Sequence, residues 1–380
     1  MIRILQVVTI MDRGGLETMI MNYYRNVDRN KVQFDFLTHR DSDGAYGEEI
    51  KSLGGKIYHL PKLNPFSYSY KKALAMFFKE HSEYKIIHVH QDCLSSVILK
   101  VAKKCGISVR IAHSHNTSQD KNLKYPIKLF FRKHIAKYAT ELMACSKDAG
   151  NWMFCGAPFR VLNNAIDSEK YIYNIEKRQT VREQLGILNN EIVIGHVGRF
   201  YPQKNHTYLI DIFYQIRTNY PNSKLLLIGD DKGEIADKVK DKINDLRLSN
   251  SVIFAGVRND VADLMQAMDA FVFPSIYEGL PVTVIEAQAA GLKCFISSNI
   301  TDEVCITDLV ERVSINIHSK EWADKILDTE SFVHKNTRQE VISAGYDIHS
   351  AAQWLTQFYM NSIGENDSDR SKETDKKRFV

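Results

Sequence analysis

The stretch PSIYEGLPVTVIEAQAAG, residues 274–291, joins the end of an expected strand to the start of an expected helix. The run AFVFPS, which overlaps its beginning, is short and apolar, and this favours a buried strand. Pro281 stands in the first turn of the expected helix, where proline is tolerated. Two carboxylates, Glu278 in the loop and Glu286 about one turn into the helix, lie eight positions apart. The stretch therefore predicts a strand–loop–helix unit that carries two glutamates.

The same alternation of short apolar runs and longer amphipathic runs continues along most of the chain. We predict strands at Ile2–Thr9, Phe34–Leu37, Ile57–Leu60, Ile86–His90, Val109–His113, Glu141–Ala144, Ile192–Val197, Lys224–Ile228, Val252–Ala255, Ala270–Phe273 and Lys293–Ile296. Apolar strands separated by helices favour parallel sheets that are covered on both faces. Because 380 residues are too many for one ordinary core, the sequence predicts two doubly wound, Rossmann-like α/β domains that face a cleft.

The polar stretch from Asp167 to Glu191 separates the two sets of strands. The expected order is an N-terminal domain over 1–165, a linker over 166–190, a C-terminal domain over 191–345, a helix over 346–364 and a disordered charged tail over 365–380. The helix over 346–364 is a candidate for crossing back to the N-terminal domain.

Composition excludes several classes of protein. The chain is 44% apolar and 25% charged, as soluble globular proteins are, and its net charge of +4 is too small to indicate nucleic-acid binding. Its six cysteines include no C-x-x-C pair, so we expect reduced thiols in a cytoplasmic protein and no metal site. The pattern Asp41–Asp43 is interpreted as chance. No run of 18 apolar residues and no signal-peptide pattern is present.

Backbone groups near the start of the expected helix could bind an anion. Gly279 allows a tight backbone, and the N–H groups of Leu280, Val282 and Thr283 would then point into the cleft. Side chains lean toward the N-terminus of their helix, so Glu286 would lean toward this site as an acceptor for a pair of hydroxyls. A surface helix with two solvated glutamates is the alternative.

Two cations follow another expected strand. In GHVGRFYPQKNH, residues 195–206, Arg199 and Lys204 bracket the loop after Val197. The planar guanidinium of an arginine, with its forked donors, and the compact ammonium of a lysine together suit a diphosphate. Alone, the two would be surface cations, but they lie at the same edge of the same predicted sheet as Glu278 and Glu286, which favours a site.

The N-terminal half has two weaker motifs. Gly14 and Gly15 precede a helix and would let a phosphate or sugar approach the backbone, although no dinucleotide or P-loop fingerprint is present. An ordinary turn before a helix is the alternative. In RIAHSHNTS, residues 110–118, His113 and His115 cluster where a strand should end. They would contact a sugar or belong to a hydrogen-bonded loop, and no third metal ligand is obvious beside them.

The segments GRFYPQKN, FAGVRNDV and FPSIYEGLPVTVIEAQAAG resemble the family 4 glycosyltransferases of the two-domain B-type fold (GT-B). The hallmark of that family is E-x7-E, which Glu278 and Glu286 match. The segments GGLETMIMNYYR and RIAHSHN look like the branch that builds bacterial capsular polysaccharides and exopolysaccharides. The resemblance covers roughly residues 1–350.

The resemblance implies a retaining transfer from a nucleotide-activated sugar, usually a UDP-sugar, without a metal or other cofactor. Glu286 would bind the ribose hydroxyls and Glu278 the donor sugar, while Arg199 and Lys204 neutralise the diphosphate. The backbone over 279–283 would add donors.

The resemblance also assigns contacts to residues outside this cluster. Gly15 would approach the donor from the other domain, and the base would lie near Val257 and Arg258. Either His113 or His115 would touch the sugar; we favour His115.

The stretch Lys121–Thr140 contains six Lys or Arg residues and no Asp or Glu, with Leu129, Phe130 and Phe131 among them. This pattern favours contact with an anionic membrane surface; an ordinary basic helix packed on its domain is the alternative. Membrane contact fits the lipid-linked acceptor that the resemblance implies, and would place the protein on the inner face of the cell membrane. Two other functions stay open: a nucleotide-sugar 2-epimerase, which needs no acceptor, and a protein that binds sugar nucleotides without catalysis.

Overall fold

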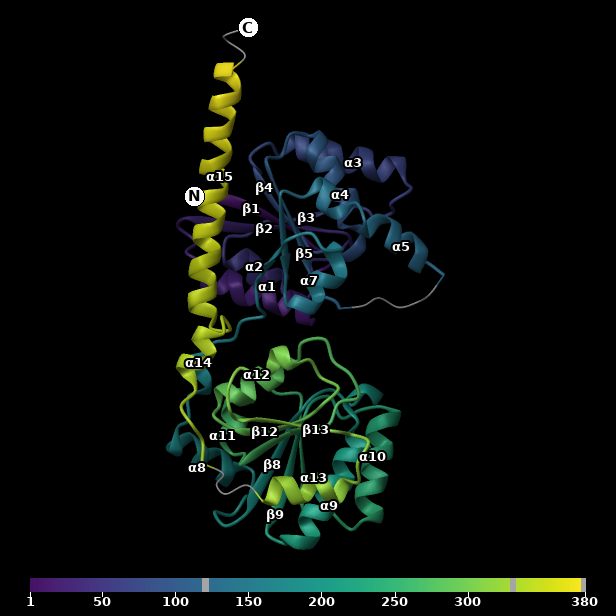
Figure 1. Cartoon of the computed structure of the whole chain (residues 1–380), viewed down its shortest axis with the longest axis vertical. Helices are drawn as coiled ribbons and strands as arrows, with labels where there is room; N and C mark the ends of the chain where they lie inside the picture. The colour runs from purple at the N-terminus through teal and green to yellow at the C-terminus, as the bar shows by residue number, and fades with distance from the viewer. Residues whose placement is uncertain (118–122, 329–332, 377–380) are drawn as a thin grey trace. The chain divides into compact units, whose positions relative to one another are not determined.

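The computed structural model describes residues 1–117, 123–328 and 333–376 (Figure 1). The chain forms two compact α/β units, Met1–Ala165 with Ile348–Val380, and Ile166–Asp347. Each unit is built on a parallel sheet with helices on both faces, which confirms the predicted fold class of two doubly wound domains.

The first unit has a seven-stranded sheet in the order β3-β2-β1-β4-β5-β6-β7. The strands are β1 (Ile2–Val7), β2 (Val32–Thr38), β3 (Ile57–His59), β4 (Ile86–Val89), β5 (Val109–Ser114), β6 (Glu141–Ala144) and β7 (Arg160–Val161). The helices are α1 (Gly15–Asn26), α2 (Gly47–Ser52), α3 (Tyr68–Glu80), η1 (Asp92–Leu94), α4 (Ser95–Lys104), α5 (Tyr125–Arg132), α6 (Ile135–Tyr138) and α7 (Lys147–Phe154). All six predicted strands of this half are present, and β7 is an additional short edge strand.

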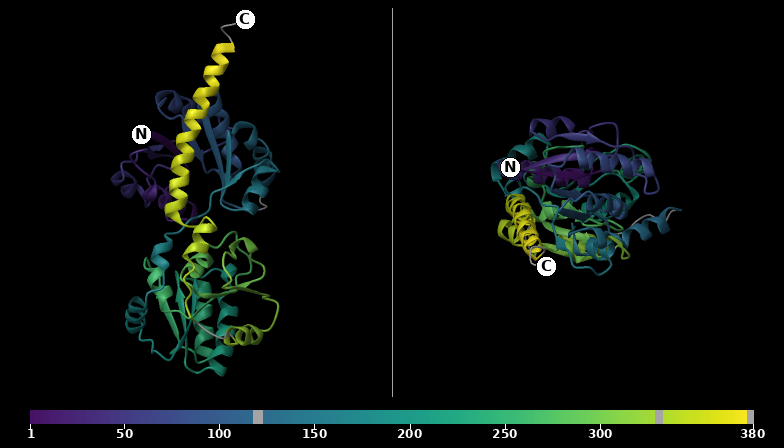
Figure 2. Two further views of the ribbon diagram at one scale, coloured as in Figure 1. Left: turned by 60° about the vertical axis from the view of Figure 1, so that its left-hand side comes forward. Right: turned by 90° about the horizontal axis from the view of Figure 1, so that it is seen from above.

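The long helix α15 (Ile348–Lys376) packs on the sheet of the first unit (Figure 2). Leu355 and Tyr359 join Phe34 and residues of α1 in one hydrophobic cluster, while α3, α4 and α7 bury their apolar faces in a second cluster. The C-terminal segment thus completes the core of the N-terminal unit. The helix assignment extends to Lys376, past residue 365, where we expected a disordered tail to begin.

The second unit has a six-stranded sheet in the order β10-β9-β8-β11-β12-β13. The strands are β8 (Ile192–Val197), β9 (Ser223–Ile228), β10 (Val252–Gly256), β11 (Ala270–Phe273), β12 (Lys293–Ser297) and β13 (Val310–Val313). The helices are η2 (Ser168–Tyr171), α8 (Ile175–Gln184), η3 (Pro202–Lys204), α9 (His206–Asn219), α10 (Glu234–Asp245), α11 (Val261–Gln266), α12 (Val282–Ala289), η4 (Asp302–Val304), α13 (Ser319–Leu327) and α14 (Arg338–Ser343).

Residues 166–190, which we expected to be a linker, are part of this second unit. Tyr171 and Val181 are buried in its core. Arg178 and Arg182 both form ion pairs with Asp269, at 2.6 and 3.4 Å. These non-local contacts explain why a polar sequence folds here as an integral part of the domain.

Strand order reverses at one point in each sheet, between β1 and β4 and between β8 and β11. In open α/β sheets, ligands bind outside the carboxyl ends of the strands at such a reversal. The loops that carry Arg199, Lys204 and Glu278 follow β8 and β11, and the glycine pair follows β1. The topology therefore places these sequence motifs where each unit is open to a ligand.

Candidate active site

The loops after β8 and β11 are joined by a partly buried ion pair. The Nζ atom of Lys204 lies 2.8 Å from Oε1 of Glu278 and 4.5 Å from the ring centroid of Phe273. Gln203 donates from Nε2 to the other carboxylate oxygen of Glu278 at 2.9 Å. The side chain of Glu278 is only 9% exposed, so two donors hold this carboxylate in place. Gln203 is a contributor that sequence reasoning missed.

Backbone contacts fix the same two loops against each other. Ile276 donates its N–H to the carbonyl of Gln203 at 2.8 Å, and Asn205 donates from Nδ2 to the carbonyl of Pro274 at 3.2 Å. Asn205 adopts a left-handed conformation with φ 57°, which asparagine tolerates better than most residues. The position of Lys204 is therefore set by its loop as well as by its ion pair.

Arg199 is the second cation of the cluster. Its side chain is exposed, and its guanidinium carbon lies 4.9 Å from the ring centroid of Tyr201. In the described part of the chain no carboxylate pairs with it. The backbone at Gly198, just before Arg199, approaches Gly229 so closely that only glycine fits there, since a Cβ on residue 229 would lie 2.1 Å from the carbonyl oxygen of Gly198. Arg199 is thus a cation that an incoming anion could bind.

The N-terminus of α12 offers backbone donors. Its N-cap Pro281 provides no side-chain hydrogen bond, and among the described residues the N–H groups of Val282 and Thr283 have no acceptor. The side chains of Leu280 and Val282 pack against the core. Gly279 does not have the positive φ that the expected tight backbone would require; a Cβ there would meet nothing within 4 Å, so the residue leaves open space.

Glu286 on α12 accepts a hydrogen bond from the hydroxyl of Tyr171 at 2.8 Å through Oε1. Its Oε2 atom has no protein donor within the described residues. Burial raises the pKa of Glu286, and burial together with the nearby carboxylate raises the pKa of Tyr171 well above 10. One oxygen is thus held by the protein while the other is available to a ligand hydroxyl. Tyr171 lies in the expected linker, so the sequence did not point to it.

The expected base-binding segment follows β10 at the sheet edge. Val257 is 75% exposed, so its side chain could cover a planar ring. Arg258 forms an ion pair with Asp260, with Nε 2.7 Å from Oδ1. The charge of Arg258 is therefore compensated, and the segment offers the exposed surface of Val257 together with backbone groups.

In the first unit, the two glycines after β1 differ. Gly15 begins α1, and a Cβ there would meet nothing within 4 Å, so the backbone is open to a ligand. A Cβ on Gly14 would lie 2.4 Å from Oε2 of Glu17. The carboxylate of Glu17, whose pKa is raised by burial, occupies that space. Only Gly15 therefore matches the expected ligand approach.

His113 and His115 belong to a cluster of four histidines. His88 contacts Nδ1 of His113 through Nε2 at 3.1 Å, and His90 contacts Nε2 of His115 through Nδ1 at 2.8 Å. Nε2 of His113 and Nδ1 of His115 are buried without a partner. One nitrogen each of His88, His90 and His113 lies within 4.8 Å of the others, so the third metal ligand that the sequence did not show is available. The rings of His88 and His90 and those of His88 and His113 are stacked, with centroids 4.4 and 5.1 Å apart, and the nitrogens of His88 and His113 already contact each other.

Gln6 links the two histidine pairs. Its Oε1 accepts from Nε2 of His90 at 3.0 Å, while its Nε2 donates to the hydroxyl of Tyr359, which contacts Nδ1 of His88 at 2.7 Å. With this amide orientation, His90 accepts from His115, which leaves an unprotonated nitrogen on His115. On the other side, the hydroxyl of Tyr359 donates to Nδ1 of His88, and Nε2 of His88 donates to Nδ1 of His113. The proton of the neutral His113 ring is then on its Nε2 atom. Reversing the amide exchanges these roles, so in either case one histidine offers a donor and the other an acceptor, as a hydroxyl ligand requires.

The histidine cluster makes the first unit sensitive to acid. Burial lowers the pKa of His88 and of His115 to about 3, and lowers the pKa values of His90 and His113 well below 6.5. Between pH 6.5 and about 3 the unfolded chain binds more protons, so stability falls as pH falls. We expect a loss of about 1 kcal/mol per histidine between pH 7 and 5.5. Urea unfolding at several pH values measures it, and equal stability at pH 7 and 5.5 would contradict neutral buried histidines.

Two doubly wound units with cations beside a strand-order reversal define a two-domain α/β class of protein with a candidate anion site. Comparisons with known proteins identify the family. The family model described as "Glycosyltransferase Family 4" matches residues 13–170, and the model "Glycosyl transferases group 1" matches residues 177–347. The chain is a glycosyltransferase of the GT-B type and belongs to family 4, in the branch of capsular polysaccharide and exopolysaccharide biosynthesis.

Several relatives match most of the chain. A Bacillus subtilis protein named as glycosyltransferase EpsF is 35% identical, covering 97% of this chain and 98% of its own. The Escherichia coli UDP-Gal:alpha-D-GlcNAc-diphosphoundecaprenol alpha-1,3-galactosyltransferase is 26% identical over 77% of this chain and 80% of its own. A crystal structure of a Rickettsia africae glycosyltransferase is similar in fold, with a TM-score of 0.77, 18% identity and coverage of 95% and 98%.

A structure of Anabaena HepE in complex with UDP has a TM-score of 0.72 at 19% identity and covers 99% of this chain and 100% of its own. At this level of identity the likeness concerns the fold alone. The likeness over the whole chain agrees with the two-domain GT-B fold.

Proposed function

We propose that this glycosyltransferase moves a sugar from a UDP-sugar to a lipid-linked, growing polysaccharide repeat unit, with retention of the anomeric configuration and without a metal cofactor. The observation that carries the proposal is the partly buried Lys204–Glu278 pair beside the uncompensated cation Arg199. The cations suit a departing diphosphate, and the carboxylate suits the hydroxyls of the transferred sugar.

The charge that develops during transfer supports these roles. As the glycosidic bond lengthens, negative charge accumulates on the diphosphate and the sugar acquires oxocarbenium character. Arg199, Lys204 and the N–H groups at the start of α12 are donors that need little rearrangement to stabilise the diphosphate. None of the described groups has to act as a covalent nucleophile. Retention would then follow from attack on the same face, with the leaving phosphate accepting the proton of the acceptor hydroxyl.

The names of similar proteins support the choice of donor and acceptor. The E. coli relative is named for transfer from UDP-Gal to a saccharide on diphosphoundecaprenol. Structures of HepE contain UDP and UDP-glucose. A lipid-linked acceptor would require the enzyme to work at the cytoplasmic face of a membrane. No helix in the described ranges is long and apolar enough to span a bilayer, so we propose peripheral contact through Lys121–Thr140, of which residues 121 and 122 lie outside the described residues.

A panel of nucleotide sugars tests this proposal. We expect calorimetry to show binding of UDP-sugars and no comparable binding of GDP-, ADP- or CMP-sugars. With lipid-linked acceptor, product should form in the presence of a chelator, and the product anomer should match that of the donor. Conversion of donor to its 2-epimer without acceptor would identify the epimerase alternative. Binding without any turnover over a panel of acceptors would identify a non-catalytic protein.

A further inference from the structure

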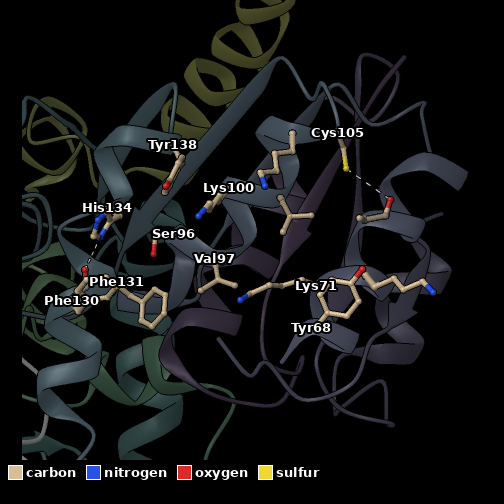
Figure 3. Close-up of a pocket in the computed structure, with 14 residues that line it drawn as sticks. Tyr68, Lys71, Ser96, Val97, Lys100, Cys105, Phe130, Phe131, His134 and Tyr138 are labelled. Carbon is tan, nitrogen blue, oxygen red and sulfur yellow. Dashed lines mark hydrogen bonds between the residues drawn. The ribbon is translucent and has the colours of Figure 1, made fainter. Parts of the chain in front are cut away.

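A cavity of about 590 Å³ lies in the first unit among α3, α4, α5 and α6 (Figure 3). None of the candidate active-site residues lines it. Its walls are largely apolar and include Ala75, Val97, Val101, Phe130 and Phe131. The volume falls within the range of pockets that hold small ligands.

Four lysines from two helices surround this apolar space: Lys71 and Lys72 from α3, and Lys100 and Lys104 from α4. No Asp or Glu lines the cavity, and within the described residues none of the four forms an ion pair with a carboxylate. In Figure 3, Lys71 and Lys100 extend toward the space beside Val97. Lys100 also lies over the ring of Tyr138, with Nζ 5.8 Å from the ring centroid. The cavity therefore combines apolar walls with positive charge that no carboxylate of the described structure compensates.

Ser96 adds an independent sign of a missing ligand. It lies in the first turn of α4, lines the cavity and is 2% exposed. Its Oγ atom is buried and has no hydrogen-bond partner. A buried hydroxyl without a partner is unfavourable unless a ligand or water completes it. Lys100 follows one turn later on the same helix face, so an anionic oxygen could contact both side chains.

The surroundings of the cavity are apolar and exposed. No residue of α5 is buried; Phe130 on this helix is 60% exposed, and Tyr68 at the start of α3 is 80% exposed. On another side of α5, a second cavity of about 480 Å³ is lined by Phe66, Ile127 and neighbouring residues. Exposed aromatic and aliphatic side chains among lysines are typical of surfaces that meet anionic lipids.

We propose that this cavity binds one anionic prenyl lipid, with the hydrocarbon chain against Val97, Val101 and Phe131 and the phosphate among Ser96, Lys71 and Lys100. The apolar walls disfavour a fully hydrated anion, and the lysines disfavour a neutral chain or a basic peptide. The inference rests on the proposed lipid-linked acceptor, since it names the part of the chain that would hold the lipid portion of that substrate.

Farnesyl diphosphate is a short, water-dispersible probe for this site. We expect the full-length protein to bind it in calorimetry more tightly than it binds either farnesol or inorganic diphosphate. The double variant Lys71→Gln/Lys100→Gln should bind it about 10- to 30-fold more weakly, since each lysine contributes roughly a factor of five to the attraction of an anionic lipid. The matched control Lys79→Gln/Lys103→Gln removes two exposed lysines of the same helices that do not line the cavity. Its affinity should stay within about twofold of the wild type.

A second variant tests the apolar part. Ala75→Phe fills the cavity and should weaken binding of farnesyl diphosphate while leaving binding of UDP unchanged; unchanged UDP binding also shows that the protein is folded. Equal affinity of the two lysine double variants, or tighter binding of inorganic diphosphate than of the prenyl compound, would overturn the proposal.

The same assay distinguishes a prenyl phosphate from a membrane phospholipid as the ligand. It also distinguishes failure of the lipid-site proposal from failure of the proposed sugar transfer. Phosphatidylglycerol vesicles that displace the probe as well as a prenyl phosphate does would show a general membrane-lipid site and overturn the prenyl assignment. Because the readout is lipid binding, its failure would leave UDP binding and sugar transfer untouched. A failure of the donor panel, in contrast, would remove the proposed function and leave lipid binding measurable.

Discussion

Replacing Lys204 with alanine is expected to lower kcat/KM for sugar transfer about 10²- to 10³-fold, the usual effect of removing one preorganised group that stabilises transition-state charge. Lys204 is the partly buried cation of the site, with Nζ 2.8 Å from Glu278. Its loss removes a positive charge that would lie beside the departing diphosphate, and it also leaves the carboxylate of Glu278 without its cation. Kinetics with saturating acceptor should show the loss mainly in kcat, because the diphosphate charge develops in the transition state.

A second lysine in the same unit provides a matched control. Lys224 pairs with Glu191 at 3.6 Å, and the two side chains are 20% and 11% exposed, against 18% and 9% for Lys204 and Glu278. Lys224→Ala should therefore lose comparable stability without the loss of turnover. If both variants lose activity in proportion to their loss of stability, Lys204 acts only as a structural partner of Glu278.

The fold could be predicted from sequence because its signals are local. All eleven predicted strands are present, and Glu141–Ala144, Ile192–Val197 and Ala270–Phe273 have the predicted bounds. Ile192–Val197 and Ala270–Phe273 are short, largely apolar and almost fully buried runs, as the strands of parallel sheets typically are, while Glu141–Ala144 is buried in its second half. The strands that were missed, β7 and β13, lie at sheet edges; β7 has two residues and β13 reads VERV, which has no continuous apolar run.

Parts of the site depend on non-local contacts, which sequence spacing does not show. Tyr171 reaches Glu286 across 115 positions, and Gln203 reaches Glu278 across 75. The space at Gly14 is filled by the nearby Glu17, so the glycine pair alone could not show which backbone is open. In each case the missing information is the direction of a side chain after the loops have packed.

The histidine cluster, in contrast, has a signal that could have found it. His88 and His90 are two positions apart on one predicted strand, and His113 ends the next predicted strand with His115 two positions further on, so extended backbone would place each pair on one face of the sheet. Adjacent parallel strands bring such pairs together, and β4 and β5 are neighbours. The amide of Gln6 and the hydroxyl of Tyr359, which complete the network, come from distant segments and could not be read this way.

The two glutamates of the E-x7-E motif have different environments, which argues for different roles. Glu278 is held through both oxygens by Lys204 and Gln203. Glu286 is held through one oxygen by Tyr171. When a donor binds, Lys204 can turn from Glu278 to the diphosphate, and the carboxylate of Glu278 can then accept hydrogen bonds from substrate hydroxyls nearby. A carboxylate with one free oxygen and a neutral partner suits an acceptor for a ribose diol.

Glu286→Ala is expected to weaken UDP binding about 10- to 100-fold, because a hydrogen bond to a charged group contributes roughly 1.5–3 kcal/mol. Comparing UDP with 2′-deoxy-UDP by calorimetry isolates the ribose contact. The wild type should prefer UDP about tenfold or more, and Glu286→Ala should lose that preference along with its affinity. A variant that still discriminates between the two nucleotides would show that Glu286 does not accept from the ribose.

Tyr171→Phe is the matched control for this experiment, since it removes the hydrogen bond to Glu286 and keeps the carboxylate. It should retain the preference for UDP over the deoxy form.

The dependence of UDP binding on pH provides an independent check. Because burial raises the pKa of Glu286, UDP affinity should fall as pH falls through that raised value, where the carboxylate gains a proton and loses acceptor strength. Glu286→Ala should lack this pH dependence, because it has no carboxylate left to titrate at the ribose.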